Sequence, residues 1–368
     1  MARMDFTALF FSASHDRQHL VKDLDSLMRT EPHTLTILPY ASEKSPIECF
    51  EAYDRNRRFS CIGREDGVSL FKLIFESPRI GSERPVIEGK FFVYEHPELV
   101  NTYLLMTIES QDFVRRALLP FIERSYPRIL LSIVSHQHMK LLLYKFRDDC
   151  GFTDLRVVRA VLRSRFAGQK MGAEAVIPSV SWPYLGLAGT FDFAQEQNGW
   201  FQSLTFEALR DSTVHAEITL ARDGMVKTDG QLLKVFDNLV SKICKTAHEN
   251  HKLFRMRSRR DNPLLDVKPL AINFGREQLA DGGERDKLIE VMRSLDKTSL
   301  SVVHNNPYLQ LSVIDYIDGS TFELWVLNPR ELIIVPQLKG TVAGIRRLVS
   351  HVFDNYAEGS IEDFRMVA

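Results

Sequence analysis

A basic segment stands out in the second half of the chain. Its cations are Lys245, His248, Lys252, Arg255, Arg257, Arg259 and Arg260. Five of them, from Lys245 to Arg259, are separated by 3, 4, 3 and 4 positions, which places them along one stripe of a helix. Clustered Lys and Arg bind phosphate backbones by releasing counterions, and Arg can bind one phosphate in bidentate fashion. The segment therefore predicts contact with nucleic acid.

The same segment has a purely structural interpretation. Cations near the end of a helix complement the helix dipole, and they can pair with local acids such as Asp261 and Asp266. Both interpretations stay open at the level of sequence.

A second basic feature lies in the alternating stretch 153–166, which is typical of a strand. Arg159, Arg163 and Arg165 have the same parity, so their guanidinium groups should line one face near the end of this strand. Such a row is either a second contact for phosphates or the charge that protects an edge strand from aggregation.

Asp66 and the tripeptide Glu88-Gly89-Lys90 form a third candidate site. An Asp followed across a hairpin by Glu-x-Lys resembles the motif of restriction-type nucleases, over a few dozen residues. The resemblance implies a metal-dependent nuclease in which carboxylates hold Mg²⁺ and a lysine stabilises charge. The alternative is that Asp66-Gly67 is an ordinary turn.

Two shorter motifs favour structural interpretations. His138-Met139-Lys140 resembles half of the phospholipase-D-type nuclease motif, but position 145 is Lys where that family has Asp. Asp315 and Asp318 could pair around a metal, but Asp318-Gly319 between two strand-like stretches is a hairpin-turn signal.

Composition limits the remaining classes. The chain has 368 residues with 44% hydrophobic and 26% charged residues, typical of a packed globular protein. Its 47 Lys and Arg balance 48 Asp and Glu, so any charged site must be local. No Walker, dinucleotide or Gly-x-Ser-x-Gly motif is present, which disfavours ATPases, Rossmann dehydrogenases and common hydrolases. Four widely spaced cysteines and the lack of a signal or transmembrane pattern favour the cytoplasm.

Strand and helix patterns predict how these residues are positioned. Expected strands cover 6–11, 34–38, 58–62, 68–75, 86–94, 102–108, 129–134, 153–166, 200–209, 214–221, 299–304, 309–316, 322–327 and 332–335. Expected helices cover 20–27, 113–121, 135–149, 231–260, 285–295 and 342–356. Strands in antiparallel clusters interrupted by single helices predict an α+β fold with curved sheets backed by helices. The linker-like stretch 167–172 divides it into two α+β domains, 1–166 and 173–368.

The leading interpretation is a cytoplasmic, non-catalytic or weakly catalytic protein that binds the phosphates of DNA or RNA without a cofactor, as a subunit of a larger complex. One alternative is the nuclease centred on Asp66, Glu88 and Lys90, the only reading that requires Mg²⁺. The other is a scaffold that meets a protein partner or oligomerises; neither membrane nor metal binding is expected. A chain without housekeeping motifs would fit an accessory system such as microbial antiviral defence.

Overall fold

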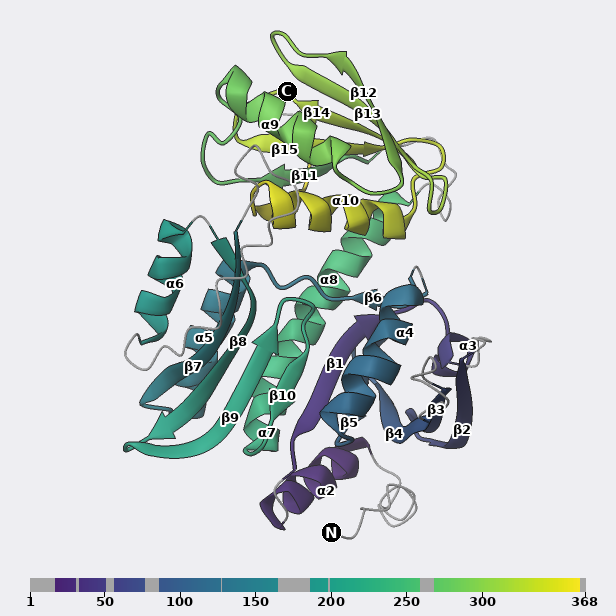
Figure 1. Cartoon of the computed structure of the whole chain (residues 1–368), viewed down its shortest axis with the longest axis vertical. Coiled ribbons are helices and arrows are strands. Elements are labelled where there is room, and N and C mark those ends of the chain that lie inside the picture. Colours follow the sequence, from purple (N-terminus) through teal and green to yellow (C-terminus); the bar gives the residue numbers. More distant parts are fainter. Residues whose placement is uncertain are drawn as a thin grey trace, which may run out of the picture. The chain divides into compact units, whose positions relative to one another are not determined.

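The computed structural model describes residues 17–30, 33–50, 56–76, 86–126, 128–164, 186–197, 199–258 and 268–364 (Figure 1). These residues form helices and two antiparallel sheets, one of ten strands and one of six. The predicted α+β fold class is therefore confirmed. Hydrophobic faces of both sheets are covered by helices, as this class of fold requires.

The larger sheet has the strand order β2-β3-β4-β5-β1-β10-β9-β8-β7, and β6 pairs with β1. Its strands are β1 (Leu35–Ala41), β2 (Arg57–Glu65), β3 (Val68–Glu76), β4 (Val86–Glu95), β5 (Thr102–Thr107), β6 (Leu130–Leu131), β7 (Asp154–Ser164), β8 (Gly199–Arg210), β9 (Thr213–Ala221) and β10 (Val226–Thr228). Asp66 and Gly67 join β2 to β3 with φ angles of 40° and 75°, typical of a two-residue hairpin turn.

One face of this sheet carries a helix formed by η1 (Phe113–Leu118) and α4 (Leu119–Arg124). The buried cluster under it joins Leu38 and Tyr40 of β1 to Val114, Ala117 and Phe121 of the helix. In Figure 1, α4 lies in front of β1 and β5, whereas no described helix lies in front of β8, β9 and β10. The described helices therefore cover only one half of the sheet on this face.

The other face packs on a separate helical layer. Phe206 of β8 meets Phe146 of α5 (His136–Cys150) with ring centroids 6.3 Å apart, and Tyr94 of β4 meets Phe236 of η2 (Phe236–Val240) at 6.0 Å. Helices α7 (Leu232–Val235), η2 and α8 (Ser241–Arg257) follow one another without interruption. Ser135 caps α5 by accepting from the His138 amide, and Gly151 ends it with a φ of 65°.

The smaller sheet has the order β12-β13-β14-β15-β11-β16. Its strands are β11 (Leu270–Asn273), β12 (Thr298–His304), β13 (Leu309–Asp315), β14 (Thr321–Val326), β15 (Glu331–Pro336) and β16 (Ser360–Asp363). Two helices accompany it, α9 (Gly282–Arg293) and α10 (Val342–Asn355). The apolar stripe predicted for the last helix is confirmed, since Val342, Ile345, Val349 and Val352 are all buried.

The chain divides into two compact units, and neither unit is one continuous stretch of sequence. Described residues up to Val161, 186–193 and 201–248 belong to the first unit; 162–164, 194–200, 249–258 and 268–364 belong to the second. Strands β8, β9 and β10 follow residue 173 but belong to the ten-stranded sheet. The predicted domains 1–166 and 173–368 stay a prediction, because 165–185 lie outside the described residues.

Most predicted elements are found with shifts of a few residues at their ends. The strand expected at 129–134 is reduced to the two residues of β6, and the expected strand 6–11 lies outside the described residues. Five elements were not predicted: α3 (Pro46–Phe50), α6 (Leu187–Glu196), β10, β11 and β16. Three of these are strands of three or four residues, too short to show a periodic pattern.

Candidate nucleic-acid interface

The basic stripe of α8 is exposed as the spacing predicts. The side chains of Lys245, Lys252 and Arg255 face solvent, while Ile243, Cys244, Ala247 and Phe254 of the same helix are buried. Lys245 and Arg255 are ten positions apart, which corresponds to about 15 Å along the helix axis. The helix therefore presents cations at regular intervals along one exposed face.

Lys245 and Lys252 make no ion pair or hydrogen bond with any other residue of the described part of the chain. Glu249 is exposed between them and pairs with neither. Both ammonium groups are thus available to an external anion. A cation without a counter-ion on the protein retains its full attraction for phosphate.

His248 occupies the same stripe but is half-buried. Its Nδ1 lies 3.2 Å from the carbonyl oxygen of Val100 and 3.4 Å from Thr102 Oγ1. Nδ1–H can donate to the carbonyl, which attaches α8 to the turn before β5. His248 therefore has a structural contact that the spacing alone did not indicate.

Arg257 does not belong to the exposed stripe. It is only 3% exposed, and its guanidinium donates to the carbonyl oxygens of Pro269, 3.1 Å away, and Leu253, 2.7 Å away, and pairs with Asp363 of β16. This corrects the expectation that Arg257 contacts phosphate, because the fold turns its side chain inward to hold the chain on either side of it. Arg259 and Arg260 lie outside the described residues.

Strand β7 exposes arginines as expected. Arg159 and Arg163 face solvent, and Arg165 lies outside the described residues. The buried positions of β7 are odd-numbered up to Val157 and even-numbered from Ala160. Arg156 lies before this shift and is therefore exposed as well. Arg156 pairs with Glu207 of β8, whereas the Arg163 guanidinium lies 6.0 Å from the ring centre of Trp200.

The nuclease residues are not brought together. Asp66 is in the β2–β3 turn, beside the end where Val68 pairs with Tyr94, whereas Glu88 pairs with Ile74. Six residues of strand separate these pairs, or about 20 Å. Glu88 forms an ion pair with Lys72 at 3.2 Å, and the Lys90 amide donates to Glu109. This register corrects the proposed constellation, because one metal cannot contact both carboxylates.

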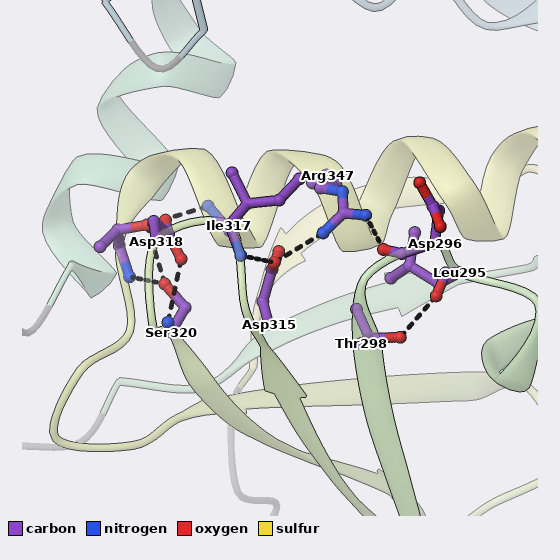
Figure 2. Close-up of polar contacts among 10 residues, drawn as sticks. Leu295, Asp296, Thr298, Asp315, Ile317, Asp318, Ser320 and Arg347 are labelled. Carbon is purple, nitrogen blue, oxygen red and sulfur yellow. Dashed lines mark hydrogen bonds and ion pairs between the residues drawn. The ribbon is translucent and has the colours of Figure 1, made fainter.

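The smaller motifs are structural. Lys140 of the His138–Lys140 motif is on α5, 3.7 Å from Asp192. Asp315 and Asp318 stabilise the β13–β14 turn (Figure 2). Asp315 accepts a hydrogen bond from the Ile317 amide and forms an ion pair with Arg347 at 2.6 Å. Asp318 accepts a hydrogen bond from the Ser320 amide. Across the described residues, no three or more His, Cys, Asp or Glu side chains are arranged to hold a metal ion.

The sequence analysis missed one polar row, which crosses the larger sheet on the face that carries η1 and α4. Cross-strand pairing aligns Thr107, Thr36, Lys227, Thr219 and Thr205 across β5, β1, β10, β9 and β8. Alternation within β8 and β9 could have indicated a polar face. The alignment itself depends on pairing between strands far apart in sequence.

The sequence matches no protein-family model and no curated protein. Among the described residues, no helix is both long and apolar enough to cross a lipid bilayer.

Proposed function

We propose that this protein binds the phosphate backbone of nucleic acid through the exposed stripe of α8, formed by Lys245, Lys252 and Arg255. The observation that carries the proposal is that two lysines one heptad apart are exposed and have no partner among the described residues. Phosphate contacts position a protein on nucleic acid and carry no sequence information. Binding should therefore be insensitive to sequence and strongly dependent on salt.

Arg159 and Arg163 of β7 are proposed as additional contacts. Both side chains face solvent, and arginine can bind a phosphate with two parallel N–H groups. Nucleic-acid binding that is unchanged in Arg159→Glu/Arg163→Glu would remove β7 from the proposed contacts and leave α8.

The test is a fluorescence-anisotropy titration with double-stranded DNA, single-stranded DNA and RNA at several salt concentrations. The variant Lys245→Glu/Lys252→Glu/Arg255→Glu should bind at least about tenfold more weakly than the native chain. The matched control Lys22→Glu/Lys145→Glu/Lys339→Glu changes the same net charge at exposed positions elsewhere. Binding that is absent at low salt, or lost equally in the control, would overturn the proposal. Cleavage that appears only with added Mg²⁺ would indicate a metal-dependent nuclease whose site is not the pair Asp66 and Glu88.

Strand β12 supports a second candidate function, assembly with another copy of the chain. It is at the edge of the smaller sheet, and Val302 and Val303 are 40% and 57% exposed. The strand contains no Asp, Glu, Lys or Arg, so two copies can pair antiparallel without opposing like charges. Light scattering of the native chain and of Val303→Lys tests this, since only the native chain should form a dimer.

A further inference from the structure

Lys227 occupies an unusual position on the uncovered half of the larger sheet. It is half-buried on β10, between Thr36 of β1 and Thr219 of β9. Its ammonium donates to Gln111 Oε1 at 2.5 Å and forms no ion pair within the described part of the chain. A partly buried cation without a carboxylate partner is unfavourable unless something else neutralises it.

A second cation lies near Lys227. Arg115 is on η1, four residues after Gln111, and is exposed without a carboxylate partner among the described residues. Burial lowers the pKa of Lys227 and the charge of Arg115 lowers it further, whereas Asp223 in the β9–β10 turn raises it. The two cations therefore repel one another, and one carboxylate offsets only part of their charge.

Thr36 supplies an independent observation. It is 2% exposed, and its Oγ1 has no hydrogen-bond partner in the described structure. Thr36 and Lys227 are direct partners across the β1–β10 pair, so their Cβ atoms lie on the same face, about 5 Å apart. Buried hydroxyl groups almost always have a partner, and one without a partner calls for an explanation such as a bound group.

We propose that Lys227, Arg115, Gln111 and Thr36 form a binding site for a phosphate monoester group. The two cations match its charge of about −1.5 to −2, whereas a carboxylate carries only one charge. The Thr36 hydroxyl and the Gln111 amide can donate to the phosphate oxygens. Such a group occurs on a free nucleotide or sugar phosphate and at the phosphorylated end of a nucleic-acid strand.

The site does not depend on the proposed function of α8. Thr36 and Lys227 are on the sheet face that carries η1, while Tyr94 and Phe236 place the helical stretch leading into α8 on the opposite face. Each site can fail in an experiment without the other.

Isothermal titration of the full chain with inorganic phosphate, AMP and acetate tests the site. Inorganic phosphate and AMP should bind with a stoichiometry of one, and acetate should bind at least about tenfold more weakly. Lys227→Met, which removes the charge and keeps an unbranched side chain one atom shorter, should weaken phosphate binding at least about tenfold. Thr36→Val should weaken it about threefold or more. The charge-matched control Lys145→Met should bind like the native chain.

The melting temperature distinguishes a loss of phosphate binding from misfolding of the variant. Thr36→Val should raise the melting temperature of the unliganded chain, because it removes a buried hydroxyl without a partner. A single-stranded oligonucleotide with a 5′-phosphate, compared with its 5′-hydroxyl form, separates the two sources: a preference that disappears in Lys227→Met assigns the site to strand ends, and equal binding assigns it to small molecules. No phosphate binding by the native chain, or unchanged binding by a folded Lys227→Met variant, would overturn the proposal.

Discussion

Basic residues on α8 and on α10 meet opposite environments, although both helices are amphipathic. On α8, Lys245 and Lys252 face solvent and have no partner in the described structure. On α10, Arg347 bonds the buried carboxylate of Asp315 and the carbonyl oxygen of Asp296, which joins the helix to the end of β13 and to the turn before β12 (Figure 2). A cation therefore serves binding or folding according to whether the fold places an acceptor beside it.

The largest expected loss of stability comes from breaking the ion pair between Arg347 and Asp315. Arg347→Met leaves Asp315, whose side chain is 2% exposed, as an uncompensated buried charge. The free energy of unfolding should fall by about 3–5 kcal/mol. Guanidinium unfolding followed by tryptophan fluorescence measures it, since Trp200 and Trp325 both belong to the second unit. Arg293→Met, which removes an exposed ion pair with Glu290, should cost less than about 1 kcal/mol. Equal losses would show that Arg347 contributes no more than a surface cation.

Substitution of Arg257 and of Arg255, two arginines of α8, should have different effects on stability and on binding. Arg257→Met leaves two carbonyl groups without their donor and should lower the free energy of unfolding by about 2 kcal/mol. Arg255→Met should change it by less than about 0.5 kcal/mol. Nucleic-acid affinity should show the reverse order, with the larger loss in Arg255→Met. If Arg257→Met instead weakened binding without affecting unfolding, the assignment of the two roles would be wrong.

His351 of α10 should make the stability of the chain depend on pH. Its Nε2–H donates to the Val291 carbonyl at 2.7 Å, and Nδ1 accepts from the Asn355 amide at 3.1 Å, so the neutral ring satisfies both neighbours. Burial lowers the pKa of His351; Arg347 lowers it further, while the Val291 carbonyl and Asp354 raise it.

Because the folded pKa lies below the unfolded value of about 6.5, the unfolded chain binds more protons just below that pH. The contribution of His351 to stability should be complete above about pH 6.5 and decrease as the pH falls, by at most about 1.4 kcal/mol per pH unit. Unfolding measured between pH 5 and 8 should show this slope in the native chain and not in His351→Gln. An identical slope in both chains would refute the assignment to His351.

The smallest expected effect is a change in the salt dependence of nucleic-acid binding when one lysine of the exposed stripe is removed. Lys252→Ala should reduce the slope of log K against log salt by about 0.9 on duplex DNA, the value for one phosphate contact. Lys145→Ala, an exposed lysine of α5, should leave the slope unchanged. The titrations described for the α8 variant provide the measurement. A slope that does not change in Lys252→Ala would remove this lysine from the interface.

The sequence predicted the exposed part of the candidate interface better than the buried part. Helical spacing correctly placed Lys245, Lys252 and Arg255 on one stripe, because that stripe depends only on the local period. The same spacing could not distinguish Arg257, whose acceptors are 12 and 106 residues away in Pro269 and Asp363. Likewise, Asp66 and Glu88 were each recognisable, but only the register of β3 and β4 shows that they are far apart.

Local patterns along the chain already determined the α+β class, most of the longer strands and helices, and the apolar stripe of α10, because burial repeats with the period of each element. Tertiary pairing alone decided that β1 lies between β5 and β10, and that β11 lies between β15 and β16. The row formed by Thr36, Lys227 and Thr219 exists only through that pairing. Its residues come from strands separated by as many as about 190 positions, and no local period connects residues across such a distance.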